Sequence, residues 1–306
     1  MTWLERYFYA PSLSQKILAY SLYPISLIYA QIATLKRALA RYEDLHIPII
    51  SVGNLVAGGS GKTPFILEIA QDLAPLYHVG VVSRGYGRSS QGCQVVSQQG
   101  EVLIPQIQAG DEAFLLATQL KKASVVVSID RKQGILQAKQ LGAQVVLLDD
   151  GFRFAFKKLN IVLKPKLKPY FDFCLPSGIY REPVSCYDLA DLLIEEGLDY
   201  QREVKLLCPS PRMLLVSAIA HPSRLDPYLP PVVGKLYFKD HARFDLDLLQ
   251  KAFKKHGATS LLVTPKDAVK LADCLLPLSV LDLRLLIKPA IKAKILGYVK
   301  TQLKSL

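Results

Sequence analysis

The chain has 306 residues, of which 50% are hydrophobic, so it is long enough for two ordinary domains with a large buried core, and wholesale disorder is excluded. Its 38 lysines and arginines outnumber 26 aspartates and glutamates, which suits an acidic partner such as nucleic acid, an anionic membrane surface or a phosphorylated substrate. The five cysteines are scattered without a C-x-x-C pair, which disfavours a disulfide framework or a zinc site and favours a reducing, cytoplasmic compartment.

The N-terminal part of the chain contains an unusually apolar stretch. Residues 17–35, ILAYSLYPISLIYAQIATL, carry no charge and have basic residues on both sides. As a helix, these 19 residues would span about 28 Å, close to the hydrocarbon thickness of a bilayer. Pro24 weakens a simple spanning helix, and a buried core helix or two short helices remain open. The functional interpretation assigns residues 1–45 to a membrane-associated helical segment that is embedded in, or lies on, the bilayer.

From residue 47 onwards, short apolar runs alternate with helical patterns. The expected strands lie at 47–54, 78–85, 123–130, 143–150 and 159–163, and the expected helices at 63–76, 111–120 and 131–141. The Val/Ile/Leu runs are continuous rather than alternating, which indicates strands buried on both faces of a parallel sheet. The β-α-β-α order predicts a doubly wound α/β fold.

The second half of the chain repeats this pattern on a smaller scale. Strands are expected at 212–220 and 259–267, and helices at 245–257 and 289–306. A proline-rich stretch, 222–231, lies between the expected strand at 212–220 and the expected helix at 245–257. We expect a larger domain at 46–205 and a smaller α/β domain at 206–306.

The stretch GGSGKT follows the first expected strand and precedes the first expected helix, which is the context in which a P-loop is credible. Its backbone N–H groups can hold phosphate oxygens, Lys62 can neutralise them, and Thr63 can offer its hydroxyl to Mg²⁺. We therefore expect a P-loop NTPase-like sheet that binds ATP and Mg²⁺. The expected ATP-binding residues are Gly58, Gly59, Ser60, Gly61, Lys62 and Thr63. Val56 stands where the usual pattern has its first glycine, so the loop has an altered entry.

Two pairs of acidic residues stand where they could face this loop. Asp149 and Asp150 end the expected strand at 143–150 and could hold Mg²⁺ or its water, although acidic residues also cap ordinary turns. Asp111 and Glu112 precede a helix, where one could accept the proton of an acceptor hydroxyl, or both could only cap the helix. Nucleotide binding alone leaves a switch ATPase and a kinase open. Ala57 stands where membrane-associated switch ATPases often carry a signature lysine, which disfavours the switch.

Further motifs follow in chain order: SRGYGR (83–88), GDE (110–112), DR (130–131), LDDGF (148–152), LPSGIYREP (175–183), DH (240–241) and VTPKDAVKL (263–271). Together with the loop, whose altered entry is typical of the family, they resemble the tetraacyldisaccharide 4'-kinases, the lipid A 4'-kinases of Gram-negative bacteria. The resemblance covers most of the chain. It departs from the family pattern at Arg153-Phe154, where Gln-His is usual, at Ala113, where proline is usual, and at Pro265, where an acidic residue is usual.

The resemblance implies transfer of the γ-phosphate of ATP to the 4'-hydroxyl of a tetraacyldisaccharide 1-phosphate, at the cytoplasmic face of the inner membrane. The matching functional positions are Asp111 as general base, His241 as its supporting histidine, Lys62 and Arg131 at the phosphates, and Thr63, Glu112, Asp149 and Asp150 at the metal. A phosphoryl-transfer site depends more on position and charge neutralisation than on base strength, which suits a weak base such as aspartate.

The same resemblance fits the basic composition, because the implied substrate is an anionic amphiphile. We expect the lipid A disaccharide 1-phosphate and an anionic inner-membrane surface as partners. No nucleic-acid recognition module is apparent, so no nucleic-acid partner is expected. A monomer is expected. The remaining alternative is a membrane-associated switch ATPase that does not phosphorylate a lipid.

Overall fold

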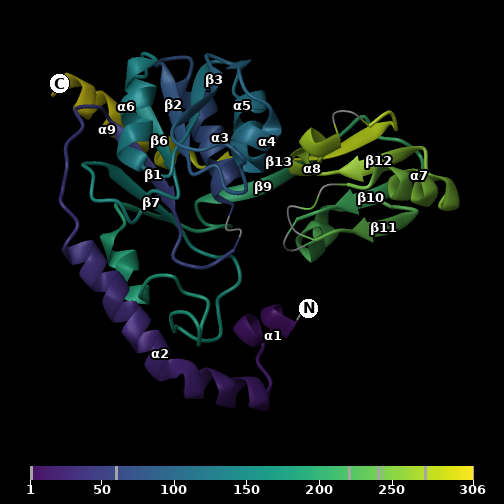
Figure 1. The fold of residues 1–306 in the computed structure, drawn as a ribbon, viewed down its shortest axis with the longest axis horizontal. Helices are drawn as coiled ribbons and strands as arrows, with labels where there is room; N and C mark the ends of the chain where they lie inside the picture. The colour runs from purple at the N-terminus through teal and green to yellow at the C-terminus, as the bar shows by residue number, and fades with distance from the viewer. Residues whose placement is uncertain are drawn as a thin grey trace.

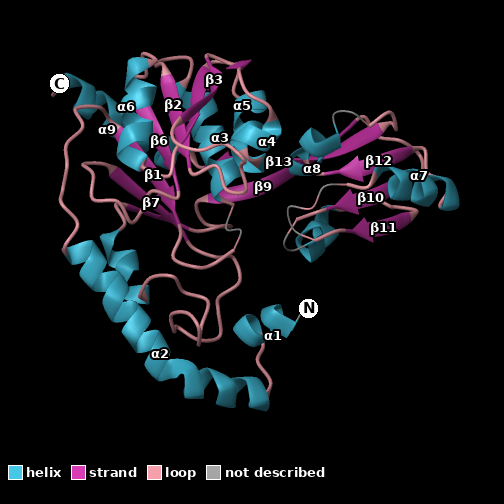
Figure 2. Cartoon of the chain, in the orientation of Figure 1, coloured by secondary structure: helices cyan, strands magenta, loops and turns pink. Residues whose placement is uncertain are grey.

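The structure is a computed structural model that describes residues 3–58, 61–219, 222–239, 242, 244–271 and 274–305. Within them the chain forms a large unit around an eight-stranded sheet and a small unit around a five-stranded sheet. Figure 1 shows the two units side by side, with a long N-terminal helix along the outside of the large one. Figure 2 shows the mixed helix and strand content of both units.

The large sheet has the strand order β4-β3-β5-β2-β6-β1-β7-β8. Its strands are β1 (Ile49–Gly53), β2 (Val79–Ser83), β3 (Gln94–Gln98), β4 (Glu101–Val102), β5 (Ala123–Val127), β6 (Val145–Asp149), β7 (Leu159–Leu163) and β8 (Leu192–Ile194). Near one edge, β3 runs antiparallel to both of its neighbours, β4 and β5, and the other neighbouring strands run parallel. Val52 of β1 lies opposite Asp149 of β6, so the carboxyl ends of these two strands meet.

Helices cover both faces of this sheet, as the strand patterns predict. α3 (Lys62–Leu73), α5 (Asp111–Gln119) and α9 (Pro289–Lys304) pack on one face and share a single hydrophobic core with it. α6 (Arg131–Gln140) packs on the other face, and the short α4 (Gln106–Ala109) precedes α5. Successive residues of β1 point to opposite faces, Ile49 toward α6 and Ile50 toward the core with α3. The predicted doubly wound α/β fold is confirmed.

The small sheet has the strand order β11-β10-β12-β13-β9. Its strands are β9 (Tyr200–Leu207), β10 (Met213–Ser217), β11 (Gly234–Tyr237), β12 (Ser260–Val263) and β13 (Leu278–Ile287). Its helical segments are α7 (Leu246–Lys255), α8 (Pro265–Ala268), η2 (Pro222–Tyr228) and η3 (Val269–Leu271), whereas η1 (Val184–Leu189) precedes β8 in the large unit. α7 lies within the helix expected at 245–257, and Asp245 caps it by accepting hydrogen bonds from the backbone N–H groups of Asp247 and Leu248.

β9 and β13 connect the two units as a long antiparallel ribbon. They pair over eight residues, from Val280 opposite Leu207 to Ile287 opposite Tyr200. Tyr200, Leu285 and Ile287 lie in the core of the large unit, whereas Leu281 lies in a core of the small one. After the ribbon, α9 returns to the large unit. The expected domain boundary near residue 205 therefore falls within β9, on a ribbon that both cores share.

The N-terminal segment forms α1 (Trp3–Tyr9) and the long helix α2 (Leu13–Ala38). Ser12 and Gln15 form a capping box that begins α2, and the helix continues through Pro24. Ser26 is buried and hydrogen-bonds Ser177 at 2.8 Å, and Arg37 pairs with Glu182 at 3.2 Å, which fixes α2 to the loop before η1. α2 is one continuous and mostly exposed helix, which contradicts the two alternatives left open by the sequence, a buried core helix and two short helices. It is exposed because few of its apolar residues pack against other parts of the described chain.

α2 is also the one helix of the described chain that is long and apolar enough to cross a membrane. Only 11% of its most apolar part is buried. Leu13, Ile17, Ile28 and Leu35 are each more than half exposed. The exposed apolar side chains of such a helix can contact a lipid phase or another apolar surface.

Candidate active site

The phosphate loop begins at the end of β1 and runs into α3. Gly58 and Gly61 have φ values of 98° and 84°, in the left-handed region that glycine adopts readily. Gly61 is the N-cap of α3, so Lys62 and Thr63 open the helix, and Pro64 occupies its first turn. Gly59 and Ser60, also expected to bind ATP, lie outside the described residues.

The altered entry of the loop has a structural reason. Val56 is buried and forms a β-bridge with Tyr180, and the N–H of Ala57 donates to the carbonyl of Ile179 at 2.9 Å. Val56 also belongs to a hydrophobic cluster with Leu55 and Phe152. A side chain packed in this way anchors the loop to segment 175–183, which a glycine could not do.

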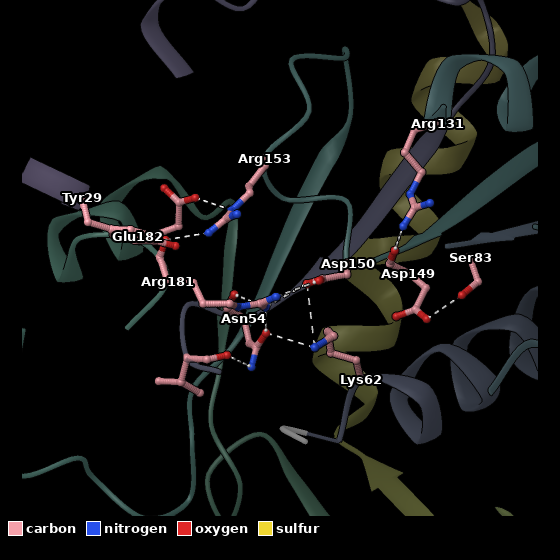
Figure 3. A network of polar contacts seen from close by, with 11 residues as sticks. Tyr29, Asn54, Lys62, Ser83, Arg131, Asp149, Asp150, Arg153, Arg181 and Glu182 are labelled. Carbon is pink, nitrogen blue, oxygen red and sulfur yellow. Dashed lines mark hydrogen bonds and ion pairs between the residues drawn. The ribbon is translucent and has the colours of Figure 1, made fainter. Parts of the chain in front are cut away.

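Lys62 lies in a polar network with Asn54, Asp150 and Arg181, shown in Figure 3. Its Nζ donates to Asn54 Oδ1 at 3.0 Å and lies 3.8 Å from Asp150 Oδ1. Both terminal nitrogens of Arg181 donate hydrogen bonds to the carboxylate of Asp150, Nη1 to Oδ2 at 3.0 Å and Nη2 to Oδ1 at 3.1 Å. Arg181 also donates to Asn54 Oδ1 at 2.6 Å. Two cations thus converge on one carboxylate beside the phosphate loop.

Asp149 and Asp150 adjoin in sequence but have opposite electrostatics. Asp149 ends β6, is buried, and accepts a hydrogen bond from Ser83 Oγ at 3.0 Å. Burial raises the pKa of Asp149 to about 6, against the opposing effect of Lys62, with Asp150 and Glu112 adding to the rise. Burial also acts on Asp150, but Lys62 and Arg181 outweigh it and hold the pKa of Asp150 below its usual value.

These residues suit Mg²⁺ by the nature of their donors. Thr63, Asp149, Asp150 and Glu112 offer hard oxygen atoms to one cavity, and the mutual repulsion of the three carboxylates is what a divalent cation would relieve. Among the described residues, no three His, Cys, Asp or Glu side chains form a complete metal-binding cluster. Mg²⁺ commonly takes only one or two carboxylates and fills its remaining positions with phosphate oxygens and water.

Asp111 and Glu112 open α5, and each meets a lysine from the small unit. Asp111 Oδ2 lies 3.1 Å from Lys270 Nζ, and its Oδ1 accepts a hydrogen bond from Gln106 Nε2 at 3.0 Å. Glu112 Oε1 lies 3.2 Å from Lys266 Nζ. Gly110, with a φ of 84°, sets the entry of the helix, since a Cβ there would lie 2.7 Å from the carbonyl oxygen of Tyr86. His241, the expected partner of Asp111, lies outside the described residues.

Arg131 is buried behind the carboxylates and does not reach out to solvent. Its guanidinium donates to the backbone carbonyls of Asp149, at 3.1 Å, and Ser128, and it lies over the ring of Phe154 at 5.6 Å. Burial lowers the pKa of Arg131, which Asp149 and Asp150 oppose. The side chain therefore supports the turn that carries both aspartates, and it also lines the cavity.

Arg153 stands where the family pattern has glutamine, and its side chain points away from the carboxylates of Asp149 and Asp150. It pairs with Glu182 at 2.5 Å and donates to the carbonyl of Arg181 at 2.6 Å, as Figure 3 shows. Glu182 also pairs with Arg37 of α2. Arg153 thus joins the turn after β6 to the N-terminal helix.

A cavity of about 630 Å³ lies between the two units and unites these features. Its polar lining from the large unit includes Lys62, Thr63, Glu112, Arg131, Asp149 and Asp150. Its apolar lining includes Val204, Leu225, Leu281 and Leu283, which belong to the ribbon and to η2. The cavity therefore brings together nearly all the described site residues that the motifs indicate. Asp111, which precedes Glu112 on α5, does not line it.

Three basic residues that the sequence alone did not single out also line the cavity, namely Arg181, Arg202 and Lys266. Arg181 and Lys266 stand inside motifs that we quoted, whereas Arg202 stands in no motif and its position depends on the ribbon. Arg202 lies against the phosphate loop, since a Cβ on Gly61 would lie 3.2 Å from its Nη2. Its Nε donates to Glu196 at 2.9 Å, which fixes the guanidinium at that place.

Comparison with known proteins agrees with this geometry. A model of the tetraacyldisaccharide-1-P 4'-kinase family matches residues 18–210. The tetraacyldisaccharide 4'-kinase of Helicobacter pylori (strain HPAG1) is 61% identical over 298 residues, which cover 97% of this chain and 94% of the relative. That of Campylobacter jejuni (strain RM1221) is 40% identical over 299 residues, covering 97% and 96%.

Among solved structures, the "apo" form of LpxK from Aquifex aeolicus in complex with ATP matches with a TM-score of 0.76 and 29% identity. The match covers 92% of this chain and 99% of that one. A phosphate loop, paired carboxylates and a cavity between two α/β units thus occur in a chain that is similar to tetraacyldisaccharide 4'-kinases over nearly its whole length. The chain belongs to the tetraacyldisaccharide 4'-kinase family.

Proposed function

We propose that this chain transfers the γ-phosphate of ATP to the 4'-hydroxyl of tetraacyldisaccharide 1-phosphate, a step of lipid A biosynthesis, as its family membership indicates. The observation that carries the proposal is the cavity between the two units, in which the phosphate-loop lysine and three acidic residues of the large unit lie together. A phosphoryl-transfer site needs this combination of cations for the phosphates and carboxylates for the metal.

The roles follow from where each side chain lies. Lys62 neutralises the β- and γ-phosphate oxygens, and the N-terminus of α3 adds its backbone N–H groups. Thr63, Asp149, Asp150 and Glu112 would hold Mg²⁺, which would supply further charge neutralisation at the phosphates. Arg131 holds the turn of both aspartates in place.

Asp111 acts as the general base. It takes the proton of the 4'-hydroxyl while the hydroxyl oxygen bonds to the γ-phosphorus, and the bridging oxygen leaves with ADP. His241 supports Asp111. Because the transition state is loose, the position of Asp111 contributes more than its basicity.

Arg202 provides a second cation for the nucleotide phosphates. Its guanidinium lies against Gly61, at the turn over which the phosphates pass in a P-loop. The apolar residues that line the same cavity, among them Val204 and Leu283, suit the less polar part of the nucleotide or of the acceptor. Because all these residues come from one chain, a monomer suffices for the reaction.

The N-terminal segment places the enzyme on the cytoplasmic face of the inner membrane. The exposed apolar residues of α2 enter the lipid, and the basic residues at its end, among them Lys36 and Arg41, meet anionic headgroups. An amphiphilic acceptor and its kinase then meet at one surface.

The test is to incubate the purified chain with γ-labelled ATP, Mg²⁺ and the lipid disaccharide. The expected result is labelled lipid whose added phosphate is on the 4'-hydroxyl. Label found only as free phosphate would replace the proposal with a switch ATPase, and no turnover of ATP in the presence of lipid would overturn both.

A further inference from the structure

Two acidic residues at the start of α5 face two lysines from one segment of the small unit. Asp111 lies 3.1 Å from Lys270, and Glu112 lies 3.2 Å from Lys266. The lysines are four residues apart on α8 and η3, so they lie on one side of that helical segment and face the same helix. The segment is part of the motif VTPKDAVKL, which the roles proposed above leave unused.

The lysine that meets Asp111 is held in place from within the small unit. The side chain of Lys270 is only 5% exposed, and its Nζ lies 3.9 Å from Oδ1 of Asp267, which is fully buried. Asp267 is fixed in turn by Ser217 Oγ at 3.0 Å, Thr264 Oγ1 at 2.9 Å and the N–H of Ala218 at 3.2 Å. A buried ammonium keeps its place because moving it away from both carboxylates would leave unpaired charges in a low dielectric.

The carboxylate of Asp111 is therefore held by both units at once. Gln106 of the large unit donates to one oxygen and Lys270 of the small unit meets the other. The orientation of Asp111 then depends on how the small unit sits against α5.

We propose that Lys270, anchored by Asp267, is a positioning residue that couples docking of the small unit to the orientation of Asp111. This inference rests on the proposed function, in which Asp111 is the base. Lys266 and Glu112 form a second contact between the same two segments, and the two ion pairs together are called the clasp. Because Glu112 is a candidate metal ligand, docking of the small unit also affects the candidate metal site. Only when the segment 265–271 is docked does Asp111 point correctly toward the acceptor.

The experiment compares Lys270→Met, Lys270→Arg and Asp267→Asn in the full chain, with γ-labelled ATP and the lipid acceptor. We expect kcat to fall at least tenfold in Lys270→Met and in Asp267→Asn, because a small misplacement of a catalytic group is costly. Lys270→Arg should recover part of the loss, since it keeps the charge. The affinity for ATP, measured by equilibrium binding, should change less than twofold in all three.

The matched control is Lys292→Met, which breaks an ion pair of 2.7 Å between α9 and Asp72 far from the clasp and should leave kcat unchanged. Wild-type kcat in Lys270→Met would overturn the inference, as would an equal loss in Lys292→Met. If Lys270→Met fails to fold, as judged by circular dichroism, Lys270→Arg and Asp267→Asn decide, and wild-type kcat in both would overturn it. Failure of the proposed function is distinguished by the unmodified chain not labelling lipid, or by Asp111→Asn retaining full transfer.

Discussion

The opposite electrostatics of the neighbouring aspartates predict opposite effects on stability when each is neutralised. Asp149 has its pKa raised from 3.8 to about 6 by burial, so the folded chain binds a proton there more tightly than the unfolded chain does. Ionised Asp149 therefore opposes folding at neutral pH. A rise of about two units corresponds to roughly 3 kcal/mol at 1.36 kcal/mol per unit.

We expect Asp149→Asn to raise the free energy of unfolding of the metal-free protein by up to about 3 kcal/mol at pH 8, while transfer to the lipid is lost. The amide oxygen of asparagine can still accept the hydrogen bond from Ser83, so little packing changes. The gain should decline to roughly half near pH 5, as Asp149 takes up its proton in the wild type, and should vanish below the unfolded pKa near 4.

The assay is urea denaturation followed by circular dichroism, in a chelator, at pH 8 and pH 5. Asp150→Asn is the matched control. Lys62 and Arg181 hold the pKa of Asp150 low despite its burial, so ionised Asp150 stabilises the fold above its unfolded pKa. This control should be less stable than the wild type at pH 8. Equal stability of Asp149→Asn and the wild type at both pH values would refute the reasoning.

Three further predictions follow from the proposed site. Asp111→Asn should keep ATP binding and lower kcat by about 10²–10⁴-fold, measured by labelled lipid, and wild-type turnover would remove Asp111 from the base role. Deleting residues 1–42 should release the folded protein from membrane vesicles in a flotation assay, because α2 carries the exposed apolar surface, and a truncated protein that still floats would contradict this. Arg202→Met should weaken ATP binding about tenfold in equilibrium binding, as expected for a lost charge-assisted contact. Lys166→Met, which removes the other cation paired with Glu196 without touching the cavity, should bind ATP normally, and equal effects of the two variants would count against a phosphate contact.

Much of the large unit could be predicted from local patterns. Continuous apolar runs at β1, β2, β5 and β6 indicate buried parallel strands, and the glycines with Lys62 and Thr63 indicate a phosphate loop, because each feature depends on neighbouring residues only. That β1 and β6 have their carboxyl ends at the same edge then follows from the fold class, whereas the register of Val52 opposite Asp149 comes from the structure. The exposure of α2 could not be predicted, because an apolar helix looks the same in a core and on a surface.

The sequence by itself determined the doubly wound fold, the phosphate loop, the acidic pairs at 111–112 and 149–150, and the family that their order indicates. Only the tertiary structure decided how these residues act on each other. Asp111 and Lys270 are 159 residues apart, and their contact exists because the β9–β13 ribbon lays the small unit beside α5. The same holds for Arg202 against Gly61 and for the contrast between Asp149 and Asp150. The physical reason is that pairing and burial depend on the low-dielectric surroundings of a charge, and those surroundings come from segments far away in the chain.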